Sequence, residues 1–523
     1  MSTNGRQTPE GLDAMAAPAR QAIEHLVVAL ILAFVFRAFV VEAYRIPTGS
    51  MAPTLYGAHR HRVCSNCGYH YAYEVAYREG RSGVEPVCPK ITRCPNCEWE
   101  EEAAPLAVSG RYVIDSGDRI LVMKLGYELA AMAPSLGDLL GPRRWDVVVF
   151  KNPSDPTVNY IKRLIGLPNE TLEIIDGDIY IDGQIARKPD HAQKCTWFLV
   201  SDRDYLPTIR GSGRFDAIAT WAPRGPGGEH WDTSGRVLVF KGAAADASGT
   251  IGFSGPITDY YAYDDPREQD ETAVNVSDLR LATMVVVREG DGAVTLSLSK
   301  RDELYEARIE TCGMVTLWRT ELDGGKGPEI LAAGQIPPIR PKVPVRIAFE
   351  NVDYRVRLMI DGREVLRTTD DQYHPDPRAL RFAPPDQRRP RVAIAAQGID
   401  AQFWHTTLHR DIYYEKVHIT ENAADNPFEG ELGHGVAGNP IHLGSDAYYV
   451  LGDNSPKSKD SRLWWEIGPH LAECDRRGDY QAGTVPRDQM VGKALFVYWP
   501  AGHRILGSGP AIIPNFGDMR FIR

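Results

Sequence analysis

Cysteine and clustered basic residues are both scarce in this chain, and their scarcity excludes two classes of protein. Eight cysteines among 523 residues are too few for a disulfide scaffold. The formal net charge is −10, and no long basic stripe with interleaved aromatics occurs, so the electrostatic footprint of a nucleic-acid-binding protein is absent. We therefore predict no nucleic-acid partner. With 43% apolar residues, the composition is that of a globular protein with about two to four domains.

Long apolar runs are also missing, with one exception near the N-terminus. Residues 22–41 read AIEHLVVALILAFVFRAFVV, about 20 residues, which is close to the length that spans a bilayer. No Ala-x-Ala cleavage site follows promptly, so we predict a retained single-pass anchor in the cytoplasmic (inner) membrane. The alternative is a buried core helix. Arg6 and Arg20 in the polar leader, residues 1–21, favour a disordered cytoplasmic N-terminus with the rest of the chain on the outer, periplasmic or extracellular side.

Helical patterns are rare after this run, apart from a short one near residues 124–132, and β patterns dominate. Strands split by Asp-Gly turns are expected at residues 119–123, 146–150, 160–165 and 171–183, and the same texture resumes at 448–454 and 490–500. Between them, residues 190–437 carry short β-rich runs with turn-rich spacers, typical of an antiparallel sandwich. The predicted fold is mostly β: one antiparallel domain made of residues 42–61, 103–189 and 438–523, with a jelly-roll-like β-sandwich inserted at 190–437.

One part of the predicted insertion has a resemblance of its own. Residues 343–365, VPVRIAFENVDYRVRLMIDGREV, resemble lectin-like jelly-roll domains of the laminin-G and concanavalin type in their strand rhythm and their Ile-Asp-Gly turn. The resemblance implies a binding or spacer module. Its ligand is unknown from the sequence.

Three short motifs carry candidate chemistry. Ser50 lies in the run IPTGSMAPTL (46–55), just past the apolar stretch, Lys162 lies in an apolar strand pattern, and a polar loop, GDNSPKSKDSR, occupies 452–462. A seryl hydroxyl becomes an effective nucleophile when a neutral lysine takes its proton, which requires the lysine pKa to fall from about 10.4 toward neutrality. Taken singly, the motifs are equally typical of a turn, an exposed lysine and a tight loop.

Taken together, in this order and behind the apolar run, the motifs resemble the hallmark segments of the bacterial type I signal peptidases, or leader peptidases. The resemblance covers residues 22–55, 117–183 and 448–500. It implies a serine endopeptidase that needs no catalytic cofactor, with Ser50 as the nucleophile and Lys162 as the general base. The implied partners are a lipid bilayer and exported preproteins with signal peptides.

The same resemblance implies supporting roles for eight further residues. They are Thr48 as an oxyanion-stabilising hydroxyl, Ser458 as the hydroxyl that orients the lysine amine, Asp460, Arg462 and Arg163 as a charge network, Asp453 as a brace of the polar loop, and Ile46 and Ile161 at the substrate pocket.

Two other functions agree with parts of the sequence. A self-cleaving repressor-like protease also uses serine and lysine, but it would be soluble and would carry a DNA-binding domain ahead of the site. A membrane-tethered binding protein with a decayed peptidase domain would use the lectin-like insertion instead. The presence of Ser50, Lys162 and Ser458 argues against decay.

A cysteine-bearing insertion at residues 62–102 departs from the family pattern. Cys64 and Cys67 form one Cys-x-x-Cys pair, and Cys94 and Cys97 form another, which is the arrangement of a zinc ribbon with a closed, structural four-thiolate site. Two disulfides are the alternative, since an exported compartment permits them. Cys88, His61 and His70 are potential substitute ligands.

Overall fold

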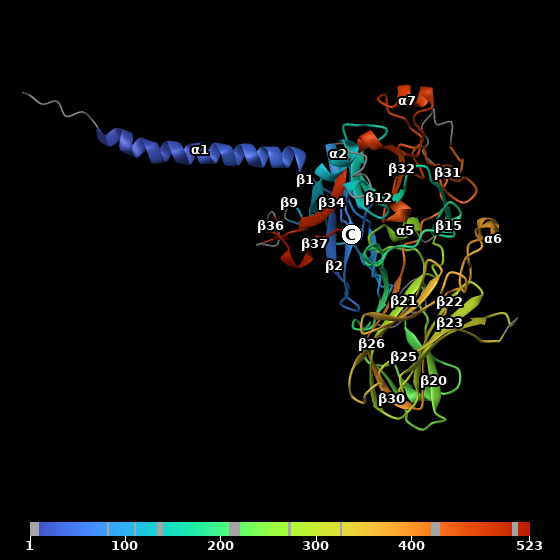
Figure 1. The fold of residues 1–523 in the computed structure, drawn as a ribbon. Helices are drawn as coiled ribbons and strands as arrows, with labels where there is room; N and C mark the ends of the chain where they lie inside the picture. Colours follow the sequence, from blue (N-terminus) through green and yellow to red (C-terminus); the bar gives the residue numbers. More distant parts are fainter. Residues whose placement is uncertain are drawn as a thin grey trace, which may run out of the picture.

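The computed structural model describes residues 10–80, 83–108, 111–132, 140–208, 220–269, 273–324, 327–419, 429–504 and 511–522. Within these residues the predicted mostly-β fold is confirmed: strands form four large antiparallel sheets and several hairpins, whereas most helices are short. Figure 1 shows one long helix, α1, extending away from a body in which the β-sandwich lies below the remaining sheets.

The first sheet carries the predicted site motifs. Its order is β1, β10, β34, β11, β12, β32 and β33, and β37 pairs with β34. The predicted strands at 119–123, 146–150, 160–165, 448–454 and 490–500 all belong to it. The bounds are β1 (Val41–Arg45), β10 (Arg119–Met123), β34 (Met490–Trp499), β11 (Val147–Lys151), β12 (Asn159–Gly166), β32 (Ala447–Leu451), β33 (Val485–Pro486) and β37 (Arg520–Phe521).

A second, smaller sheet stands beside the first. It contains β15 (Gln184–Ile185), β14 (Asp178–Ile181), β13 (Thr171–Ile175) and β31 (Ile441–His442), in that order. Strands before and after the sandwich thus pair directly in both sheets, with Arg163 opposite Leu451 and Leu172 opposite Ile441. The chain therefore leaves these sheets, forms the sandwich and returns.

The sandwich consists of two facing sheets. Alternate positions of its strands are buried, as the 2-residue period of a strand predicts, and the inward side chains of both sheets form one large apolar core. One sheet has the order β18 (Trp231–Asp232), β19 (Leu238–Gly242), β30 (Ile399–Arg410), β21 (Leu279–Glu289), β26 (Val345–Val352), β27 (Arg355–Ile360) and β28 (Arg363–Arg367), with β16 (Phe198–Asp202) on β30. The other has the order β17 (Trp221–Arg224), β20 (Ser248–Phe253), β29 (Val392–Gln397), β22 (Ala293–Lys300), β23 (Glu303–Glu310), β24 (Met314–Glu321) and β25 (Glu329–Gln335).

The cysteine-bearing segment with its flanking residues, and the C-terminal end of the chain, add hairpins. The hairpins pair β2 (His59–Val63) with β3 (His70–Glu74), β4 (Ala76–Gly80) with β5 (Gly83–Val87), β6 (Ile91–Arg93) with β7 (Glu100–Glu102), β8 (Ala107–Val108) with β9 (Arg111–Tyr112), and β35 (His503–Arg504) with β36 (Ala511–Ile513). The helices are α1 (Glu10–Phe39), α2 (Leu125–Met132), α4 (Asp190–Gln193), α5 (Pro266–Gln269), α6 (Pro377–Phe382) and α7 (Ala472–Arg477). Helix α2 confirms the helix expected near residues 124–132.

Helix α1 differs from the predicted leader and anchor at both ends. It begins at Glu10, inside the leader that was expected to be disordered, while residues 1–9 lie outside the described part of the chain. It ends at Phe39 instead of residue 41, because Val41 already pairs with Met123 at the start of β1. No helix in the described ranges combines the length and the apolarity needed to cross a membrane.

Candidate active site

Ser50 lies in a tight turn that is fastened on both sides. Ile46, just after β1, is buried and its amide donates to the Asp118 carbonyl at 2.9 Å. Met51 and Leu55, after the serine, are fully buried in the same apolar cluster. The Ser50 carbonyl accepts from the Asn454 amide at 3.1 Å, which ties the turn to the polar loop that follows β32. The apolar residues of the motif therefore hold a polar side chain in place.

Lys162, on β12, reaches this serine. Its Nζ donates to the Ser50 Oγ at 2.6 Å, and the lysine is 4% exposed. Burial lowers the pKa of Lys162 to about 8, although the carboxylates of Asp460 and Asp453 act in the opposite direction. At pH 7 an unperturbed lysine is neutral in only about one molecule in 2,500, whereas a pKa near 8 makes about one in ten neutral. The site thus supplies a usable base beside a hydroxyl.

Arg163, the next residue, points into a buried ion pair. Its Nε and Nη2 donate to the two oxygens of Asp453 at 2.7 and 2.6 Å, and both side chains are fully buried. Thr54 also donates to Asp453, at 2.5 Å, and Arg163 Nη1 donates to the Trp145 carbonyl at 2.8 Å. The pair therefore joins the serine turn, β12 and the polar loop.

A second buried ion pair shapes the polar loop itself. Arg462 Nε and Nη2 each donate to an Asp460 oxygen at 2.9 Å, and neither side chain is exposed. Asp460 also accepts from the Gly452 amide at 3.0 Å, and Arg462 donates to the Ser455 hydroxyl at 3.0 Å. These contacts close the loop on itself, beside the lysine.

Ser458 lacks the hydrogen bond predicted for it, whereas the roles predicted for Thr48 and Ile161 concern contacts with substrate. The Ser458 hydroxyl is buried and has no hydrogen-bond partner among the described residues. A Cβ at Gly452 would lie 2.1 Å from that hydroxyl and 2.5 Å from the Ser50 carbonyl, so both flank this glycine. Thr48 is exposed, and Ile161 is half-buried beside the apolar cluster that holds Met51. The expected hydrogen bond from Ser458 to the lysine amine is not formed.

The predicted insertions contribute groups to the site that motif reasoning missed. Glu74, at the end of β3, accepts from the Gly49 amide at 3.1 Å. Tyr263 packs so closely that a Cβ at Gly49 would lie 2.2 Å from its ring, and Asp264 accepts from the Asn454 side chain at 2.8 Å. Gly49 was the one local signal, because its lack of a side chain admits the tyrosine. The residue types elsewhere gave no sign of these contacts.

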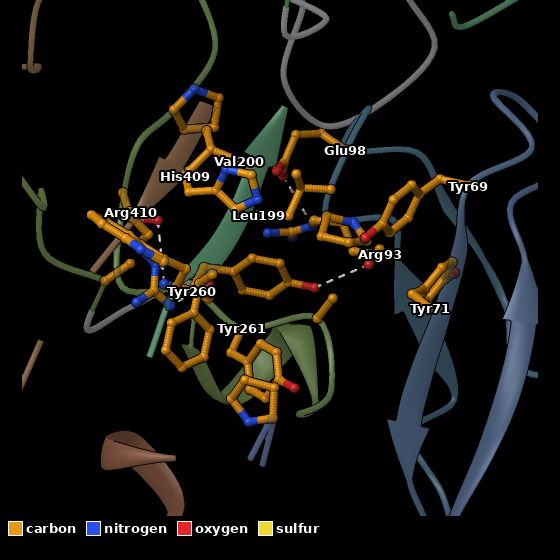
Figure 2. Close-up of a pocket in the computed structure, with 18 of the residues that line it drawn as sticks. Tyr69, Tyr71, Arg93, Glu98, Leu199, Val200, Tyr260, Tyr261, His409 and Arg410 are labelled. Atoms are coloured by element: carbon orange, nitrogen blue, oxygen red, sulfur yellow. Dashed lines mark hydrogen bonds and ion pairs between the residues drawn. The ribbon is translucent and has the colours of Figure 1, made fainter. Parts of the chain in front are cut away.

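A cavity of about 450 Å³ opens beside the site, where three parts of the chain meet. Pro53 and Tyr56 come from the serine turn, Tyr69 and Arg93 from the cysteine-bearing segment, and Tyr260 from the sandwich side. Figure 2 shows the tyrosine and arginine side chains that line it, with the Tyr260 hydroxyl donating to the Arg93 carbonyl at 3.3 Å. The two predicted insertions thus meet next to the serine turn.

The four cysteines of the two Cys-x-x-Cys pairs come together as one cluster. Cys64 and Cys97 sulfurs lie 3.6 Å apart, as do those of Cys67 and Cys94, and all four lie within 4.8 Å of one another. Sulfurs on a tetrahedral zinc ion, with Zn–S near 2.3 Å, are separated by about 3.8 Å. The four thiols are therefore close enough to hold a metal ion.

The chain matches a known family over more than half its length. A family model described as signal peptidase, peptidase S26, matches residues 19–75, 106–211 and 350–499. Signal peptidase I of Pseudomonas fluorescens is 28% identical over 158 residues, which are 30% of this chain and 35% of that protein. Signal peptidase I of Rickettsia canadensis is 43% identical over 65 residues, or 12% of this chain and 23% of that protein. The chain thus spans about a third of the length of the Pseudomonas relative.

Two solved structures similar to this chain have low identity to it. The carbohydrate-binding module CBM66 of Bacillus subtilis is 16% identical, with a TM-score of 0.24, over 36% of this chain and 96% of that chain. The exoplasmic/lumenal domain of VIP36 is 11% identical, with a TM-score of 0.27, over 43% of this chain and 94% of that chain.

Proposed function

This chain belongs to the signal peptidase family, peptidase S26, and on that premise we propose that it is a serine endopeptidase that removes signal peptides from exported preproteins. The observation that carries the proposal is the 2.6 Å contact between a buried lysine amine and the Ser50 hydroxyl. A binding module with a decayed peptidase domain would not require a lysine amine that is buried and in contact with this hydroxyl.

The proposed reaction is acyl transfer in two halves. The neutral Lys162 amine takes the hydroxyl proton while Ser50 Oγ attacks the scissile carbonyl, and the protonated lysine then gives that proton to the leaving amine. Water, deprotonated by the same lysine, hydrolyses the acyl-enzyme and restores the serine. The Ser50 amide and the Thr48 hydroxyl are the proposed donors to the oxyanion, since such donors stabilise the negative charge of the tetrahedral intermediate.

The remaining predicted residues have proposed positioning roles. The two fully buried ion pairs, Arg163 with Asp453 and Asp460 with Arg462, hold the polar loop against the serine turn. Ser458 is proposed to turn its hydroxyl toward the lysine amine once substrate is bound. Ile46, which precedes Ser50 in the motif, and Ile161, next to Lys162, are proposed to border the pocket for the small residues before the cleavage point.

The direct test is replacement of the nucleophile. We expect Ser50→Ala to lower cleavage of a model preprotein in detergent micelles by at least about 1,000-fold, since removing a nucleophile from a catalytic unit costs up to about 10⁶-fold elsewhere. Ser234→Ala is the matched control, because Ser234 is exposed on the sandwich side and its hydroxyl donates to Asp232, away from the serine turn in the sequence. Cleavage that survived Ser50→Ala would reject Ser50 as the nucleophile, and a wild-type protein that did not cleave the preprotein would favour the membrane-tethered binding protein.

Membrane attachment is proposed for helix α1. Its apolar side chains have no protein cover: eleven large ones, each at least 47% exposed, are Ile23, Leu26, Val27, Val28, Leu30, Ile31, Leu32, Phe34, Val35, Phe36 and Phe39. Figure 1 shows the helix standing clear of the body. A contiguous exposed apolar surface of this kind marks an interaction site. The proposed binding partner of this surface is the lipid of the inner membrane. The proposed topology keeps residues 1–21 cytoplasmic and the catalytic body outside.

Fractionation checks this attachment. The full chain is expected to sediment with membranes and to need detergent for release, even after carbonate washing, whereas a chain lacking residues 22–39 is expected to be soluble. Deletion of residues 420–428, far from α1 in the sequence, serves as the control. Recovery of the intact chain in the soluble fraction would contradict the proposed anchor.

We further propose that the cysteine cluster binds structural zinc and that residues 62–102 and 190–437 are insertions in the peptidase domain of residues 42–61, 103–189 and 438–523. The purified protein is expected to lose one equivalent of zinc in the Cys64→Ser, Cys94→Ser double variant, since a closed site needs all four thiolates. Cys312→Ser, at an exposed cysteine, is expected to keep that zinc. If the purified protein contained no metal and none of the four cysteines had a free thiol, the cysteines would form disulfides instead.

A further inference from the structure

Two histidines and an aspartate lie together just beyond the serine turn, outside the proposed mechanism. His59 and His61 are two residues apart on β2, so their side chains leave the strand on the same face. Asp115 stands directly opposite His59: each residue's amide donates to the other's carbonyl, at 3.1 and 2.9 Å. One nitrogen of each histidine and one oxygen of the aspartate lie within 4.8 Å of one another.

The hydrogen bonds of His59 determine which nitrogen is available. Its Nδ1 lies 2.7 Å from the Gly57 carbonyl, and a carbonyl can only accept, so Nδ1 carries the ring proton. The Nε2 of His59 therefore presents a lone pair, and it faces the Nε2 of His61 at 3.1 Å. Two nitrogens on a tetrahedral zinc ion are about 3.3 Å apart, and a ligating histidine usually donates its other N–H to a carbonyl or carboxylate.

We propose that His59, His61 and Asp115 form a binding site for a divalent transition-metal ion of the Zn²⁺ class. The donor set is two imidazoles and one carboxylate, whereas the cysteine cluster offers four thiols. Three protein ligands would leave one coordination position of a tetrahedral ion for water or another ligand. His61 is exposed whereas His59 is buried, so the group lies at the protein surface. The ion can therefore enter from solvent and exchange there.

The site is joined to the nucleophile through backbone contacts. Gly57, which accepts from His59, packs against the chain just ahead of the serine: a Cβ on it would lie 2.3 Å from the Thr48 carbonyl carbon. The next amide, that of Ala58, donates to the Pro47 carbonyl at 3.3 Å. An ion held by His59 is thus expected to stiffen the turn that carries Ser50, and metal occupancy is expected to raise the thermal midpoint of the folded protein.

The test compares zinc stoichiometry in the full-length protein. Chelator-treated protein in detergent is titrated with Zn²⁺, and the wild type is expected to bind one equivalent more than His61→Ala. This difference does not depend on whether the cysteines hold metal. His70→Ala is the matched control, since His70 is exposed on the paired strand β3 and belongs neither to the three-residue group nor to the four-cysteine group, for which it was a potential substitute ligand. Equal stoichiometry in wild type and His61→Ala would overturn the proposal and leave a plain histidine–histidine hydrogen bond.

A second variant and a second probe keep the result independent of folding defects. Asp115→Asn is expected to weaken the extra zinc equivalent by at least about 10-fold, since even changes outside the ligand set cost about 10- to 100-fold in affinity. With Co²⁺, the visible bands of a nitrogen and oxygen site should vanish in His61→Ala while thiolate charge-transfer bands stay. Unchanged Co²⁺ spectra in both variants would reject the site.

Discussion

Lys162→Arg is expected to lower kcat/KM for preprotein cleavage by about 100- to 10,000-fold, the usual contribution of a general base. Arginine keeps the positive charge and can still donate to Ser50, but a guanidinium does not give up its proton at any pH that the protein survives. The wild-type enzyme is expected to gain activity as the pH rises through about 8, because Lys162 is protonated and idle below its pKa. Lys162→Arg should lack that rise.

Lys493→Arg is the matched control for this substitution. Lys493 lies on β34 of the same sheet, opposite Val148, which also pairs with Lys162 on its other side. Its amine binds Asp146 at 2.6 Å, a contact that arginine can replace. We expect its activity and pH profile to match the wild type. Removal of a general base is expected to cost more than about tenfold in activity. If Lys162→Arg kept activity within about tenfold of the wild type, the role assigned to Lys162 would be contradicted.

Asp453→Ala is expected to lower the free energy of unfolding by about 3–5 kcal/mol, the cost of leaving one partner of a buried ion pair alone. The Arg163 guanidinium would keep its charge in a fully buried position and would lose two hydrogen bonds of 2.6 and 2.7 Å. Urea denaturation of the detergent-solubilised protein measures the change. The double variant Arg163→Met, Asp453→Leu should be less destabilised than Asp453→Ala, because it leaves no orphan charge.

An exposed ion pair provides the comparison. Asp479 binds Arg477 at 2.9 Å, but both side chains are more than half exposed. Asp479→Ala should therefore change the free energy of unfolding by less than about 1 kcal/mol. Equal effects of Asp453→Ala and Asp479→Ala would mean that the buried pair does not hold the loop.

Both proposed insertions bear on the site although neither carries the proposed chemistry. Glu74 reaches Gly49 from one of them, and Tyr263 and Asp264 reach Gly49 and Asn454 from the other. The turn with Ser50 is thus held by contacts from several parts of the chain. A change in either insertion is expected to alter the position of the nucleophile.

Local sequence patterns were sufficient for the strands, whereas the choice of candidate reacting groups needed the resemblance to a family. Short runs rich in Val and Ile, separated by turn residues, predicted β11, β12 and β34, because such runs are typical of strands. Ser50 and Lys162 were chosen through the resemblance of three motifs, in order, to the signal peptidases, since each motif alone is equally typical of a turn, an exposed lysine or a loop. The spacing of the two Cys-x-x-Cys pairs also predicted that the four cysteines come together.

Burial and long-range contact were decided only by the tertiary structure. Ser50 and Lys162 are 112 residues apart, and their 2.6 Å contact exists because β12 and the turn after β1 pack on one core. The lowered pKa of Lys162 follows from that burial, which no local pattern specifies. The missing hydrogen bond of Ser458 and the reach of Glu74 and Tyr263 likewise depend on how distant segments meet. The residue type determines which chemical group a side chain offers. The whole fold determines how far that group lies from its partner and how much water reaches it.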